Sequence, residues 1–152
     1  MDIAFPPDSP YRLLQGHSVP ATEDLLSGRY AAADDGGWSA ILKNLPLAID
    51  AIHIEQPWMW PVARRIVSLP VYRGVKVIYG SQNIESPLKK DIFASLGVGA
   101  CQGAVEAIEL LEREAVTQAD LCLAVTESDH HVLQQMGARQ TLLAPNGIEP
   151  WQ

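Results

Sequence analysis

The chain has 152 residues, of which 47% are hydrophobic and 19% are charged. This length and composition predict one globular domain and exclude an intrinsically disordered chain. The net charge of -7, from 11 basic and 18 acidic residues, argues against a protein that binds the phosphates of nucleic acid.

Residues 1–46 show no regular pattern, because proline and glycine interrupt every short apolar run. We expect them to form an irregular or shortened part of the same domain. Two short helices are predicted here, over residues 22–28 with Thr22 as the cap and over residues 37–45. Residues 1–5 have the composition of a strand stub.

From residue 47 onward, apolar strands alternate with amphipathic helices. The predicted strands span residues 48–55, 75–80, 121–126 and 141–145, and the predicted helices span 57–69, 86–97, 103–120 and 126–137. This alternation predicts an α/β domain over residues 47–145. Its sheet is expected to be doubly wound, mainly parallel and Rossmann-like, with helices on both faces.

Each predicted strand is followed by polar residues at its carboxyl end, the edge where open α/β sheets bind ligands. These tips are Glu55-Gln56-Pro57, Ser81-Gln82-Asn83, Thr126-Glu127-Ser128 and Pro145-Asn146-Gly147. We expect the four tips to converge in space. The amides of Gln82 and Asn83 suit sugar hydroxyls, and Glu85 adds a hydrogen-bond acceptor. An ordinary turn is the alternative interpretation.

Six of the eleven basic residues lie within one segment: Arg64, Arg65, Arg73, Lys76, Lys89 and Lys90. One interpretation is a solvated flank. The other is a positive edge that meets a phosphorylated acceptor or an anionic membrane surface.

The sequence predicts neither a metal site nor a covalent nucleophile. His130 and His131 project from different faces of one helix and cannot share a metal ion, and His53 is interpreted as a hydrogen-bonded core residue. Cys101 and Cys122 are interpreted as reduced, buried thiols of a cytoplasmic protein. No signal peptide or membrane span is expected, because no apolar run approaches about 18 residues.

Several motifs together resemble the amino-terminal domain of family 4-type glycosyltransferases, which have the GT-B fold. The matching residues are Ser81, Asn83, Glu85, Glu112, Ala119, Asp120, Thr126, Gly137, Pro145, Asn146, Gly147, Ile148 and Glu149. The resemblance implies transfer of a sugar from a nucleotide sugar to an acceptor, without a metal or another cofactor. It also implies that this domain is one half of the GT-B fold and supplies the acceptor side.

Eight residues are the candidate substrate-binding residues: Ser81, Gln82, Asn83, Glu85, Lys89, Thr126, Asn146 and Gly147. No residue is assigned a catalytic role. Gln82 stands where the family keeps a histidine, and glutamine does not titrate, so we expect no acid–base role at this position.

Residues 146–152 match the start of the family's interdomain linker. The nucleotide sugar is therefore expected to bind mainly to a second domain outside this chain, and the chain is not expected to be active alone. The apolar run Trp58–Trp60 is a candidate for the surface that such a partner covers. Alternative functions are a non-catalytic Rossmann-like interaction or glycan-binding module and another GT-B enzyme, such as a nucleotide-sugar epimerase. Peripheral membrane contact and the oligomeric state stay open.

Overall fold

The structure, a computed structural model, describes residues 8–13, 21–96 and 102–147. In chain order its elements are η1 (Pro10–Arg12), α1 (Glu23–Ala32), α2 (Trp38–Asn44), β1 (Ala51–Ile54), η2 (Pro57–Met59), α3 (Trp60–Ser68), η3 (Pro70–Tyr72), β2 (Lys76–Ser81), α4 (Glu85–Ser95), α5 (Gln102–Gln118), β3 (Leu121–Ala124), α6 (Glu127–Gln135) and β4 (Thr141–Leu143). Each 3-10 helix begins with a proline, whose fixed backbone angle favours a helical start.

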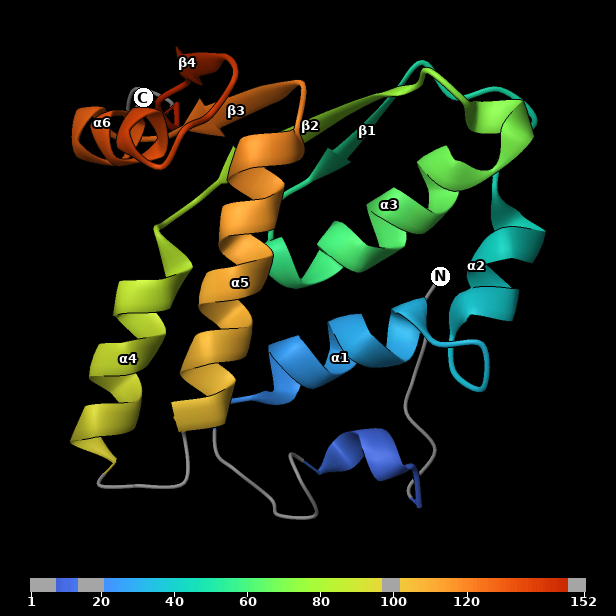
Figure 1. Ribbon diagram of the computed structural model, residues 1–152, viewed down its shortest axis with the longest axis horizontal. Helices are drawn as coiled ribbons and strands as arrows, with labels where there is room; N and C mark the ends of the chain where they lie inside the picture. Colours follow the sequence, from blue (N-terminus) through green and yellow to red (C-terminus); the bar gives the residue numbers. More distant parts are fainter. Residues whose placement is uncertain (1–7, 14–20, 97–101, 148–152) are drawn as a thin grey trace, which may run out of the picture.

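The four strands form one parallel sheet in the order β1-β2-β3-β4. The α/β class and the parallel, Rossmann-like sheet are thereby confirmed. Every connection steps to the next strand in the same direction, and right-handed crossovers of this kind place all their helices on one face. Figure 1 shows α3 and α5 on the same side of the strands. In the described residues, helices cover only this face, and the second helical layer expected from the sequence is not found there.

The main core lies between the sheet and these helices. Alternate strand residues point into it, namely Ile54, Val77, Tyr79, Cys122 and Ala124. They pack against Trp60 and Ala63 of α3, Ala115 and Val116 of α5, Ala119 directly after α5 and Leu133 of α6. Tyr79, Cys122 and Leu133 are fully buried.

The opposite face of the sheet carries the remaining strand residues, and we call it the open face. Its members are Ala51 and His53 of β1, Lys76, Ile78 and Gly80 of β2, Leu121 and Leu123 of β3 and Leu142 of β4. Leu142 is 55% exposed. The interpretation of His53 as a core residue is wrong, because His53 is exposed and its ring lies over Gly80.

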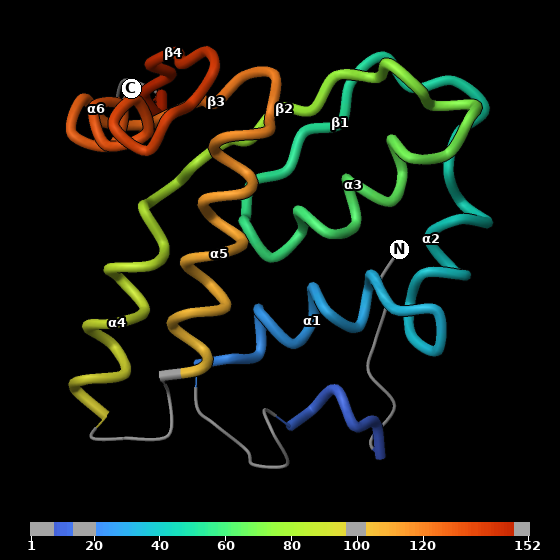
Figure 2. Tube along the Cα trace, in the orientation of Figure 1, coloured from blue at the N-terminus to red at the C-terminus, as the bar shows by residue number. Residues whose placement is uncertain are grey.

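Helix α1 forms a further layer beyond α3, on the side away from the sheet (Figures 1 and 2). A second apolar cluster joins α1 to α4 and α5 through Leu25, Leu26, Phe93, Val105 and Ile108. A third joins α1 and α2 to α3 through Ala31, Trp38, Val62, Ile66 and Tyr72. Both helices predicted before residue 47 therefore form and pack against the sheet domain.

The expected exposed patch around Trp58–Trp60 is wrong. Trp58 is 8% exposed and Trp60 is 3% exposed, because α1 covers η2 and the start of α3. The apolar surface that the sequence suggested for a partner is thus part of the interior.

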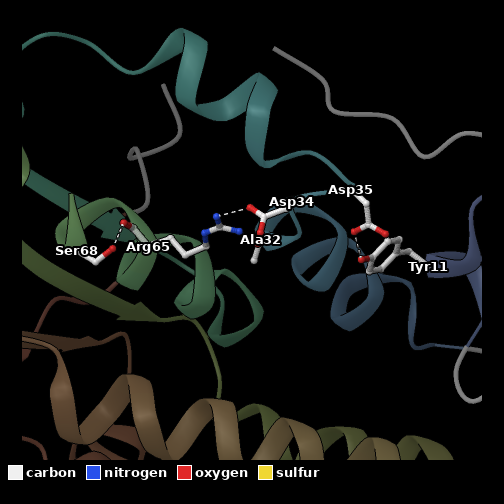
Figure 3. A network of polar contacts seen from close by, with 6 residues as sticks. All are labelled: Tyr11, Ala32, Asp34, Asp35, Arg65 and Ser68. Carbon is white, nitrogen blue, oxygen red and sulfur yellow. Dashed lines mark hydrogen bonds and ion pairs between the residues drawn. The ribbon is translucent and has the colours of Figure 1, made fainter.

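A polar network holds the turn after α1 against α3 (Figure 3). Arg65 donates hydrogen bonds to the carbonyl of Ala32 and, at 2.6 Å, to the carboxylate of Asp34. The Tyr11 hydroxyl donates to the neighbouring Asp35 at 2.7 Å. The Arg65 guanidinium also stacks 4.2 Å above the Trp38 ring. Arg65 therefore joins helices that the sequence separates widely.

Three sequence predictions lie outside the described residues: the strand stub over residues 1–5, the buried thiol of Cys101 and most of the linker over residues 146–152. Cys122 is a buried free thiol as expected, and burial raises its pKa to about 11. In the described ranges, no helix has the length and apolar character needed to cross a membrane.

Candidate functional site

A groove lies at the carboxyl edge of the sheet, between the tips of β2 and β3, and we call it the carboxyl-edge groove. Its volume is about 360 Å³, and it is lined by Asn83, Ile84, Pro87, Leu88, Asp129 and Val132. Asn83 follows β2, and Asp129 lies in the first turn of the helix that follows β3. Asn83 of one predicted polar tip therefore meets Asp129, the residue directly after a second tip, in one site.

The loop that carries Asn83 is held by the strand before it. Ser81 is 1% exposed, and its hydroxyl donates a 2.7 Å hydrogen bond to the carbonyl of Asn83. This bond folds the polar tip back on itself and leaves Asn83 exposed at the groove, with Gln82 half-buried beside it. Ser81 is thus a positioning residue for Asn83.

Glu112 of α5 caps the helix that borders the groove. Its carboxylate accepts hydrogen bonds from the backbone N–H groups of Glu85 at 2.6 Å and Ser86 at 2.9 Å, and from the Ser86 hydroxyl. These N–H groups open α4 and have no partner within the helix. Because Glu112 is fully buried, it fixes the entry angle of α4 from the interior.

Glu85 is buried and is not among the residues that line the groove. It is 5% exposed, and burial raises its pKa, with Lys89 acting in the opposite direction and Glu112 in the same direction. A hydrogen bond with the Asn83 side chain also lowers this pKa, so the Glu85 carboxylate contacts Asn83 as well as the surrounding charged groups.

The first turn of α6 forms the opposite wall. Thr126 is its N-cap: the hydroxyl oxygen accepts a hydrogen bond from the N–H of Asp129 at 3.0 Å and donates one to the Asp129 carboxylate at 2.8 Å. This reciprocal pairing fixes the Asp129 carboxylate at the groove. Thr126 acts on the site through Asp129.

The remaining candidate residues do not line the groove. Lys89 is 7% exposed and points toward α1, where its ammonium group donates to the carbonyl of Ala21 at 3.1 Å and to Asp24 at 3.0 Å. The ammonium group also lies 5.3 Å from the centre of the Trp58 ring. Asn146 and Gly147 are exposed beyond β4, outside the groove.

Four of the six clustered basic residues form ion pairs with carboxylates of the same chain. The pairs are Arg64–Glu114 at 3.2 Å, Arg65–Asp34 at 2.6 Å, Lys76–Asp120 at 2.8 Å and Lys89–Asp24 at 3.0 Å. Their partners lie on several elements, so these residues do not form one continuous positive edge. This arrangement favours the interpretation of a solvated, internally paired flank.

Five of the six groove residues were not assigned to the site from the sequence: Ile84, Pro87, Leu88, Asp129 and Val132. The sequence contains a signal for them, because residues 84, 87 and 88 and residues 129 and 132 have the spacing of one helix face. The sequence does not show that α4 and α6 lie opposite each other at the carboxyl edge of the sheet.

The site thus offers an amide, a carboxylate and apolar walls at the binding edge of an α/β protein with a parallel sheet. In the part of the chain that the structure describes, no cluster of side chains suits a metal ion. Comparisons with family models, with curated proteins and with solved structures find no match to this chain.

Proposed function

We propose that this chain is the acceptor-side domain of a glycosyltransferase and that the carboxyl-edge groove receives the saccharide acceptor. The observation that carries the proposal is the meeting of Asn83 and Asp129 with apolar Pro87 and Leu88 in one groove. Amide and carboxylate groups hydrogen-bond sugar hydroxyls, whereas apolar side chains pack against the C–H groups of the ring. A volume of about 360 Å³ is within the range of small-molecule sites.

The proposal assigns the nucleotide sugar to a second domain, and the sugar transfer to the cleft between the two domains. Asn83 and Asp129 bind and orient the acceptor, with Ser81 and Thr126 holding them in place. Gln82 contributes hydrogen bonds and no proton transfer. The buried free thiol of Cys122 supports a reducing, cytoplasmic setting.

The proposal is tested by the affinity of the purified chain for a panel of methyl glycosides, measured by isothermal titration calorimetry. For any glycoside that binds, Asn83→Ala should weaken binding by about five- to tenfold, the effect of one lost hydrogen bond. Asn44→Ala is the matched control, because Asn44 lies on α2 and its amide bonds to the carbonyl of Ala40. Equal affinities for the wild type and Asn83→Ala would contradict the proposal.

A nucleotide sugar provides a second test of the acceptor-side assignment. Uridine diphosphate glucose and guanosine diphosphate mannose should bind this chain no more tightly than millimolar. Micromolar binding of either compound would overturn the assignment and favour the epimerase alternative.

The second candidate function is a non-catalytic interaction module. The observation that favours it is the open face of the sheet, where Leu142 is 55% exposed and His53 is exposed. A module of this kind binds a partner without recognising sugars, so the absence of glycoside binding at millimolar concentrations would favour it over the first candidate.

A further inference from the structure

The charge of the carboxyl-edge groove narrows the class of acceptor that it can bind. Among the described residues that line the groove, Asp129 is the one charged side chain. Its Oδ2 accepts a hydrogen bond from the Thr126 hydroxyl, and this bond keeps the carboxylate at the surface of the groove. A ligand in this groove therefore meets a negative charge and, from the part of the wall that the structure describes, no positive charge.

The start of α4 is the first place where an anion would ordinarily bind at this edge. Helix N-termini attract phosphate groups because their first N–H groups are unpaired and carry partial positive charge. Here the Glu112 carboxylate already accepts the N–H groups of Glu85 and Ser86. A phosphate would have to displace a fully buried carboxylate of the same chain.

The N-terminus of α6 is likewise surrounded by polar groups of the same chain. Its first turn carries Glu127 and Asp129, and the N–H of Asp129 is already bonded to the Thr126 hydroxyl. The dipole of α6 is thus compensated by acidic side chains of its own first turn.

The first cation that follows the tip of β2 in the sequence is also unavailable to a ligand. Lys89 has a side chain that is 9% exposed and is paired with Asp24 on α1. Lys90 is exposed on α4 but does not line the groove.

We infer that the carboxyl-edge groove selects uncharged saccharide acceptors and rejects phosphorylated ones. This inference rests on the proposed function and specifies its substrate class. A phosphate in this groove would lie near the Asp129 carboxylate, and the described lining residues include no cation that could compensate its charge. A neutral sugar presents only hydroxyls to the same groups and meets no repulsion.

The inference is tested with matched pairs of probes: glucose and glucose 6-phosphate, mannose and mannose 6-phosphate, N-acetylglucosamine and its 6-phosphate. At low ionic strength the neutral sugar of any pair that binds should bind at least about tenfold more tightly. Added salt should reduce this ratio, because screening weakens the repulsion from Asp129.

Asp129→Asn keeps the shape of the side chain and a hydrogen-bond acceptor for Thr126, so it changes mainly the charge. It should reduce the ratio at least threefold, whereas Asp50→Asn, at an exposed site before β1, should leave it unchanged. A phosphorylated sugar that binds as tightly as its neutral partner would overturn the inference and leave the proposed function standing. If neither member of any pair binds, the proposed function and the inference both fall.

Discussion

At the scale of single residues, Glu112 shows how one buried carboxylate organises the site. It belongs to α5, yet it accepts the first N–H groups of α4, 26 and 27 residues earlier in the chain. The groove wall formed by Pro87 and Leu88 depends on where α4 begins. Glu112 therefore links the stability of the fold to the geometry of the groove.

Replacing Glu112 by alanine should lower the free energy of unfolding by about 2 to 4 kcal/mol, because two N–H groups and the Ser86 hydroxyl lose a charged acceptor. Glu112→Gln keeps one acceptor and should cost about half as much. Urea unfolding measures both. Glu109→Ala, at an exposed site on α5, should change stability by less than about 0.5 kcal/mol. A loss in Glu112→Ala as small as that of the control would refute the capping role.

Asp120 gives the fold a defined sensitivity to acid. Its carboxylate accepts hydrogen bonds from Lys76 at 2.8 Å and from the N–H of Val77 at 2.9 Å, which together lower its pKa below the ordinary value of 3.8. The folded protein thus binds this proton more weakly than the unfolded chain does. Ionised Asp120 stabilises the fold above that ordinary value, and the contribution is lost as the pH falls through the lower folded pKa.

Asp120→Asn should therefore be less stable than the wild type at pH 7 and should show a flatter loss of stability between about pH 5 and pH 2. Chemical unfolding at a series of pH values measures both quantities. Asp91→Asn, at an exposed site on α4, is the control and should follow the wild-type curve. If the stability of Asp120→Asn and of the wild type changed with pH in parallel, the Asp120–Lys76 pair would not couple folding to pH.

The sequence predicted some of these residue roles and not others. The capping of α6 by Thr126 can be predicted from the sequence, because Thr126 and Asp129 have capping-box spacing within four consecutive residues. Glu112 was marked only through a family resemblance, since its partners lie 26 and 27 residues away. Lys89 was expected at the ligand edge from its place after Asn83, but its turn of α4 faces α1.

At the scale of elements, Gly28 allows α1 to approach η2 very closely. A Cβ at this position would lie 2.1 Å from the carbonyl oxygen of Trp58 and 2.8 Å from its Cβ. No other residue type fits there without moving one of the two elements. This contact covers Trp58 and explains why it is buried.

Gly28→Ala should destabilise the fold by about 1 to 3 kcal/mol, although alanine in a helix normally stabilises it relative to glycine. A loss of stability in place of the usual gain would indicate the close approach of α1 to Trp58. Ser27→Ala, at the adjacent exposed position of α1, should change stability by less than about 0.5 kcal/mol. Thermal unfolding of the two variants decides the matter, and a stabilised Gly28→Ala would contradict this packing.

The elements from residue 47 onward were predictable because their apolar residues repeat with the period of a strand or a helix. The observed bounds of these elements differ from the predicted bounds by a few residues. The differences fall at polar turns that end strands and at caps that begin helices. The approach of α1 to Trp58 was not predictable, since a single glycine in a polar helix carries no record of its neighbour. The apolar groove residues were missed because the sequence does not show which face of α4 lies opposite α6.

At the scale of the whole molecule, the sheet has two different faces among the described residues. Helices bury one face, and Leu142 on the other is 55% exposed. The alternation of strands and helices predicted a parallel sheet correctly. It could not predict the strand order, and the order β1-β2-β3-β4 is what places the helices on one side.

Replacing one leucine by alanine on each side of the sheet measures the difference in burial between the two sides. Leu133→Ala, at a fully buried site on α6, should cost about 2 to 5 kcal/mol, whereas Leu142→Ala on β4 should cost less than about 1 kcal/mol. Urea unfolding under identical conditions provides the comparison. Equal losses would mean that the open face is covered in solution.

The central claim is that the carboxyl-edge groove is a saccharide site, and a nuclear magnetic resonance titration tests it most directly. The isotope-labelled chain is titrated with a neutral glycoside, and the shifts of its backbone and side-chain amides are followed. We predict shifts centred on the Asn83 side chain, Ile84, Leu88 and Val132. Shifts centred on Arg64, Gln118 and Arg139, which line a groove at the amino edge of the sheet, would contradict the claim. A spectrum that stays unchanged at millimolar glycoside would contradict it as well.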